Sequence, residues 1–215
     1  MRNILLAAAA VWSVTAGASM AAPAAGRPPL YLHEPWQVTT RVEEAPLTQA
    51  AVTSGDLELH AFGGLGLSGL PGVNESNPPH TYSGLCPTAC GMTLSKKGSY
   101  ADLTGFGRIR WNTKMSGFHQ IRPLIKLADG TWLVGDHATG VIGPDWLVTE
   151  FNTADLRWIK FDMERKVTVG LFLPKVDLSR VEEIGYVDLM RGSGHGQGGW
   201  SDIGLIEVYA GSSPR

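Results

Sequence analysis

Basic and amide side chains occupy alternate positions in two short β-like segments near the middle of the chain. Because strand side chains alternate in direction, the polar residues of segment 108–113 share one face, and those of segment 118–128 share another. If the two strands are neighbours, these faces merge into one basic surface. Guanidinium groups match carboxylate and sulfate oxygens, so the surface suits a uronic-acid or sulfated polysaccharide; the alternative is an outer face that is only solvated. The residues of the predicted surface are Arg108, Arg110, Asn112, Gln120, Arg122 and Lys126.

A glycine-rich segment, 188–200, surrounds a single histidine. The glycines allow the backbone to approach a ligand closely, and His195 can exchange a proton near neutral pH. Around it, Asp188 would supply a hydrogen-bond acceptor and Arg191 a cation that binds an anionic group (an anion clamp). Trp200 would supply an aromatic ring that stacks on a sugar ring. Loops on a rigid sheet often carry function, so we expect a ligand-binding loop. The alternative is a flexible hairpin whose tryptophan lies in the core.

Standard catalytic motifs are absent from the sequence, which contains no nucleophile elbow, phosphate loop, dinucleotide fingerprint or paired-histidine metalloprotease motif. A polysaccharide lyase is kept as an alternative function, because the sequence offers both groups that such an enzyme needs: a cation to neutralise a uronate and a base to remove a proton. Arg122 or Arg191 could be the cation, and His195 or Tyr186 the base. No catalytic residue is assigned. No cofactor and no metal are expected, since no loop has the dense oxygen-ligand spacing of a calcium site.

The N-terminus has the features of an export signal. Arg2 precedes an apolar run from Ile4 to about Ala16, and small residues at Ser19 and Ala21 suit a cleavage site. Residues 1–21 are therefore predicted to be a signal peptide, and the mature protein to be secreted or periplasmic. No later segment has the ~20 apolar residues of a membrane span, so none is expected after cleavage.

Two cysteines, Cys86 and Cys90, are the only ones in the chain. In an exported protein a local disulfide is the expected state. Half of a zinc site is the alternative, but a second Cys or His pair at regular spacing is missing.

Composition and length limit the remaining possibilities. The 215 residues include 18 basic and 20 acidic side chains, a formal net charge of -2, which gives no global reason to bind nucleic acid. We expect one domain over 56–210, an N-terminal arm or linker over 22–55, and a short tail over 211–215. The oligomeric state is not specified by the sequence.

Short β-rich segments separated by turn residues predict an all-β sandwich with very little helix. Asp129-Gly130 marks a two-residue hairpin, in which pairing of Ala128 with Thr131 would set Leu127 beside Trp132. Together with Trp111 and Trp158, Trp132 is then expected to fill the core.

The C-terminal half resembles galactose-binding-like jelly rolls. Residues 177–181 lead into Ile184-Gly185-Tyr186, a glycine-rich loop follows, and 202–209 closes the chain in the manner of that group. The group includes secreted carbohydrate-binding modules and the complex I intermediate-associated family, and the resemblance covers roughly 92–209. It implies a jelly-roll topology and a role in sugar binding.

These observations lead to one functional hypothesis and two alternatives. We expect an exported β-sandwich that binds carbohydrate, with an acidic polysaccharide as its partner. The first alternative is a lyase or glycoside hydrolase that acts on such a glycan. The second is a structural or assembly protein of the cell envelope that meets another protein.

Overall fold

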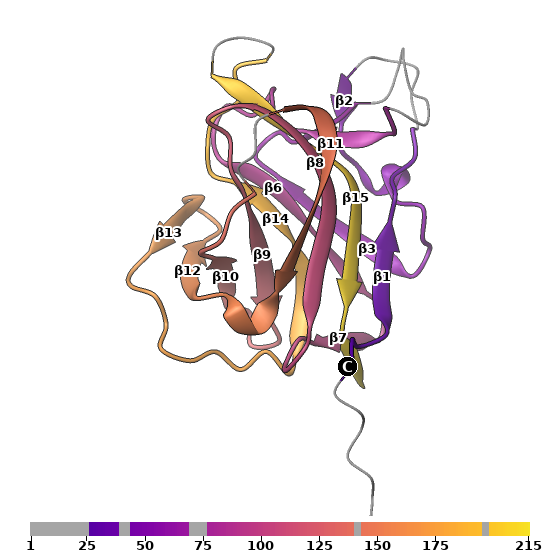
Figure 1. Cartoon of the computed structure of the whole chain (residues 1–215), viewed down its shortest axis with the longest axis vertical. Coiled ribbons are helices and arrows are strands. Elements are labelled where there is room, and N and C mark those ends of the chain that lie inside the picture. Colours follow the sequence, from indigo (N-terminus) through magenta and orange to yellow (C-terminus); the bar gives the residue numbers. More distant parts are fainter. Residues whose placement is uncertain (1–25, 39–43, 69–76, 140–142, 195–197) are drawn as a thin grey trace, which may run out of the picture.

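The protein is described by a computed structural model over residues 26–38, 44–68, 77–139, 143–194 and 198–215 (Figure 1). The predicted all-β class is confirmed: the described residues form sixteen strands in two sheets, and their only helices are two 3-10 turns. None of the helices in this part of the chain is long and apolar enough to cross a membrane. The predicted signal peptide and His195 lie outside the described residues. The 3-10 turns are η1 (Gln49–Ala51) and η2 (Thr153–Asp155).

One sheet contains seven strands. Its order is β11-β8-β15-β5-β4-β2, and β1 pairs with β15 beside this path. Every pairing in it is antiparallel. The strands are β1 (Leu30–Glu34), β2 (Glu44–Pro46), β4 (Gly66–Ser68), β5 (His80–Tyr82), β8 (Arg108–Gly117), β11 (Gly143–Asn152) and β15 (Gly199–Tyr209).

The other sheet contains nine strands. Its order is β13-β12-β10-β9-β14-β6-β3, with β7 pairing with β14 and β16 with β7. These pairings are also antiparallel. The strands are β3 (Leu57–Phe62), β6 (Cys90–Lys96), β7 (Ser99–Asp102), β9 (Ile121–Leu127), β10 (Trp132–Gly135), β12 (Trp158–Asp162), β13 (Val167–Val169), β14 (Val181–Asp188) and β16 (Gly211–Pro214).

The main core lies between the two sheets and follows the predicted alternation. In β8, Ile109 and Trp111 are completely buried, while Arg108 and Arg110, which alternate with them, are half-buried on the outer face. Trp111 packs edge-on against Phe151 and Tyr186, with ring centroids 4.9 and 6.4 Å apart. Because fully burying one large apolar side chain is worth about 1.5–3 kcal/mol, this alternation fixes which face of β8 points inward.

The hairpin between β9 and β10 is confirmed, but its predicted register is wrong by one residue. Trp132 lies opposite Lys126, and Leu133 lies opposite Ile125. The loop has three residues instead of two, with Gly130 in the left-handed region at φ 87°, a geometry that adds one residue to the turn. A one-residue shift reverses the faces, so Trp132 is on the outer side of the sheet and not in the main core.

The expected arm and tail both contribute strands. β1 pairs with β15, and the buried Glu34 at its end accepts hydrogen bonds from the backbone amides of Trp36, Thr53 and Ser54. At the other end of the chain, β16 lies within the expected tail and pairs with β7. The parts of both segments that the structure describes therefore belong to the sandwich.

Candidate ligand surface at the loop end

The two basic strands do not form a shared surface. β8 lies between β11 and β15 in one sheet, whereas β9 lies between β10 and β14 in the other. Their outer faces are therefore on opposite sides of the sandwich, and the prediction of one merged basic face is wrong. Alternation within a strand decides the face on which a side chain lies, but it does not decide which strands are neighbours. Here the chain crosses from one sheet to the other between Gly117 and Ile121.

Three of the predicted basic residues are paired with carboxylates. Nη1 of Arg108 lies 2.8 Å from Oε1 of Glu150, and Nη1 of Arg110 lies 3.1 Å from Oε2 of Glu207. Nζ of Lys126 contacts two glutamates of β14. These pairs neutralise the charge that was expected to attract an acidic glycan.

Arg122 has a different partner. Its Nη1 donates to the backbone carbonyl of Asp136 at 3.0 Å. The Asp136 carboxylate in turn accepts from the backbone N and Nε of Arg157. Burial alone would raise the pKa of Asp136, but the interactions with Arg157 and His137 together outweigh it and lower that pKa to about 2. Arg122 is thus fixed against the backbone of a neighbouring loop.

The outer face of the nine-stranded sheet is filled by its own side chains. His60 on β3 and Trp132 on β10 have ring centroids 5.4 Å apart, although four strand spacings of about 4.8 Å separate these strands in a flat sheet. Phe62 and Phe161 similarly meet at 6.2 Å. The sheet must therefore curl, with this face concave. We call these four rings and the buried side chains beneath them the concave-face cluster; the latter are Leu124, Val134 and Val187.

A charged group lies at one side of this cluster. The Glu183 carboxylate accepts from Thr93 Oγ1 at 2.5 Å and from Lys126 Nζ at 2.9 Å, and it lies 3.2 Å from Nδ1 of His60. Burial raises the pKa of Glu183, but these hydrogen bonds and the charge of Lys126 outweigh burial and hold it below its ordinary value. Lys126 also lies 5.7 Å from the ring centroid of Trp132. The group is internally satisfied, and Thr93 and Glu183 have little exposed surface.

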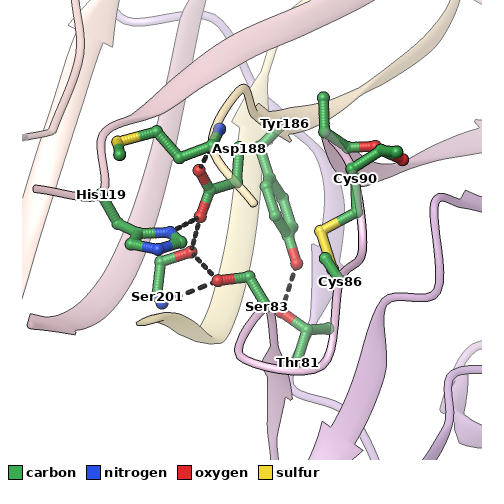
Figure 2. Close-up of a disulfide and its surroundings, with 11 residues drawn as sticks. Thr81, Ser83, Cys86, Cys90, His119, Tyr186, Asp188 and Ser201 are labelled. Carbon is green, nitrogen blue, oxygen red and sulfur yellow. Dashed lines mark hydrogen bonds and ion pairs between the residues drawn. A yellow bond between two sulfur atoms is a disulfide. The ribbon is translucent and has the colours of Figure 1, made fainter. Parts of the chain in front are cut away.

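A buried polar network lies at one end of the sandwich, where β14 ends (Figure 2). Oδ2 of Asp188 lies 2.5 Å from Nδ1 of His119 and accepts from Oγ of Ser201 at 2.7 Å. Oδ1 of Asp188 accepts from the amide of Met190, and Ser201 Oγ also lies 2.8 Å from Oγ of Ser83. Asp188 is completely buried, so the prediction that it offers an acceptor to a ligand is wrong. It joins four segments of the protein instead.

The predicted disulfide between Cys86 and Cys90 is confirmed and lies next to this network (Figure 2). The loop that leads into it, residues 83–89, is called the disulfide loop below and holds the middle of the glycine-rich segment. The amide of Gly192 donates to the Cys86 carbonyl, and the amide of Gly194 donates to the Gly84 carbonyl, both at 2.8 Å. A Cβ on Gly192 would lie 2.2 Å from the carbonyl oxygen of Ser83, so only glycine allows these two loops to approach so closely.

Three of the predicted ligand residues are next in sequence to members of this network. Gln120 follows His119, Trp200 precedes Ser201, and Arg191 follows Met190. Gln120 and Arg191 are exposed, and Trp200 is half-buried, with its ring centroid 6.3 Å from that of Tyr82. We call this surface the loop end; it consists of residues 83–89, 117–120, 189–194 and Trp200.

The loop end also carries apolar residues that sequence reasoning missed. Phe118 is 77% exposed, Leu85 is 51% exposed and Met190 is 38% exposed, and they come from three different loops. His119 and Ser201 were also missed, because a single histidine or serine in a loop has no local pattern that marks a buried network. For Phe118 the available signal was an aromatic residue placed between a glycine turn and a strand.

Tyr186, the alternative base for a lyase, is not accessible. It is buried in the main core, and its hydroxyl is 2.5 Å from Oγ1 of Thr81. Burial raises the pKa of Tyr186 far above its ordinary value. Within the described part of the chain, no group of three or more His, Cys, Asp or Glu residues is placed to hold a metal ion.

Comparisons with known proteins find distant structural likenesses. A family 11 carbohydrate-binding module from Clostridium thermocellum, solved with a β-1,3-1,4-mixed-linked tetrasaccharide, is 14% identical with a TM-score of 0.42, covering 80% of this chain and 98% of the module. A protein of unknown function from Shewanella oneidensis is 10% identical with a TM-score of 0.38, over 81% of this chain and 90% of that one. An exo-β-agarase is 10% identical with a TM-score of 0.40, over 76% of this chain and 24% of the agarase. No family model and no curated protein match the sequence. Likeness at this level assigns neither a family nor a function.

Proposed function

We propose that the protein is a carbohydrate-binding β-sandwich and that the loop end is its ligand surface. The observation that carries this proposal is that Trp200, Gln120 and Arg191 each adjoin, in sequence, a residue of the buried network around Asp188. A partly exposed indole offers an apolar ring face, while an amide and a guanidinium offer hydrogen bonds to hydroxyl groups. Binding sites commonly combine apolar contact area with a few fixed polar groups.

The two sheet faces are less suitable for a ligand. On the seven-stranded sheet, Arg108 and Arg110 are held in ion pairs with glutamates. On the nine-stranded sheet, the concave-face cluster fills the hollow with its own rings. A ligand would have to displace these contacts, whereas the exposed side chains of the loop end are held in place by the buried network beneath them.

The ion pairs also bear on the charge of the glycan. An acidic polysaccharide was expected because several cations were thought to share one face. Among those residues, Arg191 is the exposed cation at the loop end, and a single guanidinium gives a weak preference for anions. We therefore propose a neutral glycan, bound with little dependence on salt.

Native gels that contain a dissolved polysaccharide test this function directly. We expect a neutral glucan or galactan to retard the wild-type protein, and Trp200→Ala to remove the retardation. Arg108→Ala, at the opposite end of β8, is the control and should migrate as wild type. Retardation by polygalacturonate alone would contradict the neutral-glycan proposal, and new unsaturated ends absorbing in the ultraviolet would indicate a lyase instead.

The exposed apolar residues support a second candidate, a docking site for a protein of the cell envelope. Phe118, Leu85 and Met190 lie on adjoining loops, and exposed apolar patches often mark interaction sites. Co-purification of one envelope protein with wild type, lost in Phe118→Ser, together with no retardation by any polysaccharide, would favour this candidate over glycan binding.

A further inference from the structure

We propose that Asp188 is the positioning residue of the loop end, and that its carboxylate sets the geometry of all three loops at once. The inference rests on the proposed function in so far as the loop end is the ligand surface. Asp188 does not itself contact a ligand, because it is completely buried.

Asp188 is connected to the first loop, residues 117–120, through His119. Its Nδ1 lies 2.5 Å from Oδ2 of Asp188, and its side chain is completely buried. A buried imidazole in contact with a carboxylate has a fixed ring orientation, since a lost buried hydrogen bond is costly. Phe118 and Gln120 on either side of His119 are consequently held at the surface.

Asp188 is connected to the second loop, residues 83–89, through Ser201 and Ser83. Ser201 Oγ donates to Asp188, and the backbone N of Ser201 donates to Oγ of Ser83 at 2.8 Å. The backbone N of Ser83 donates to the Ser201 carbonyl at 3.0 Å. The disulfide loop therefore starts from a residue whose position depends on the Asp188 carboxylate.

The third loop, residues 189–194, is connected to Asp188 both directly and through the second loop. Its beginning is held directly, because the amide of Met190 donates to Oδ1 of Asp188 at 3.1 Å. Further along, Gly192 and Gly194 donate to carbonyls of the disulfide loop, which the serines connect to Asp188. Arg191 lies between these attachments, so its backbone position is determined from both sides.

A matched control exists elsewhere in the protein. Glu34 is another completely buried carboxylate that accepts several hydrogen bonds, but it holds the N-terminal segment to residues 53 and 54. Asp188→Asn and Glu34→Gln each replace one carboxylate oxygen by an amide group. Both should lower global stability, and only the first should loosen the loop end.

The experiment compares amide hydrogen exchange in the full-length protein and its two variants. In Asp188→Asn we expect exchange at Gly192 and Gly194 to accelerate about tenfold relative to a core amide such as that of Trp111, the change given by losing one hydrogen bond worth about 1.4 kcal/mol. Glu34→Gln should leave this ratio at the wild-type value. An unchanged ratio in Asp188→Asn, or an equal change in both variants, would overturn the inference.

Affinity for the neutral polysaccharide separates this inference from the proposed function. We expect Asp188→Asn to bind at least about tenfold more weakly than wild type, and Glu34→Gln to bind as wild type does. Equal affinities in all three proteins would overturn the positioning role while glycan binding stands. If wild type binds no glycan, the proposed function fails, and the exchange ratio still decides whether Asp188 positions the loops.

Discussion

Nδ1 of His119 lies 2.5 Å from Oδ2 of Asp188, with both side chains completely buried. This contact joins the loop after β8 in one sheet to the end of β14 in the other. A buried charge is stable only when its hydrogen-bonding needs are met, and Ser201 and the Met190 amide meet the remainder. The same atoms therefore connect the two sheets and support the candidate ligand surface.

Ser201→Ala should destabilise the protein. The change removes the hydroxyl that donates to Oδ2 of Asp188 and contacts Oγ of Ser83. Leaving these buried oxygens without that partner should lower the free energy of unfolding by about 1–3 kcal/mol. Urea unfolding measures the difference. Ser212→Ala, at an exposed position, is the control and should stay within about 0.5 kcal/mol of wild type. A Ser201 variant as stable as this control would show that the network contributes little.

Replacing both cysteines by serine should lower stability by about 2 kcal/mol, the loop-closure value for so short a bridge. It should also speed exchange of the Gly192 amide, whose acceptor is the Cys86 carbonyl. Guanidinium unfolding and hydrogen exchange measure these two effects. Reduced stability with unchanged exchange at Gly192 would mean that the disulfide does not order the glycine-rich loop.

Glu183 should make stability depend on pH in the acid range. Its pKa is lowered on folding, so its contribution is fully present above the unfolded value of about 4.5 and is lost as the pH falls through the folded value. Wild type should therefore exceed Glu183→Gln in stability at pH 7, and the difference should shrink between about pH 5 and pH 3. Urea unfolding across this range measures it, with Glu58→Gln as the exposed control. A difference that grows on acidification would contradict the assignment.

Trp132→Ala distinguishes the concave face from the loop end. The indole belongs to the concave-face cluster and contacts His60 and Lys126, so its loss should cost about 2–3 kcal/mol, less than that of a fully buried tryptophan. Glycan retardation in native gels should remain. A Trp132 variant that is stable but no longer retarded would place the ligand on the concave face.

Local patterns predicted the strands well, and the reason is physical. The inward face of β8 followed from Ile109 and Trp111 alone, because alternation is a property of the single strand. The partners of β8 and β9 could not be read in this way, since strand pairing depends on contacts far apart in the sequence. For that reason, the prediction of one merged basic surface was wrong.

The β9–β10 hairpin and the concave-face cluster show the same limit of local patterns. One extra residue in the turn at Gly130 moved Trp132 to the outer face, and the alternation in β10 alone does not reveal the length of that turn. A clue was present in β9, where Leu124 interrupts the alternation of Ile121 and Ile125. Apolar residues on both faces of a strand indicate burial on both faces. The Asp188 network had no comparable signal, because its members come from four separate segments.

The most direct test of ligand binding at the loop end follows the tryptophan indole N–H resonances during titration with a neutral oligosaccharide. The indole of Trp200 should shift progressively and saturate, while those of Trp132 and the buried Trp111 should stay in place. A titration that shifts Trp132 and leaves Trp200 unmoved would contradict the account.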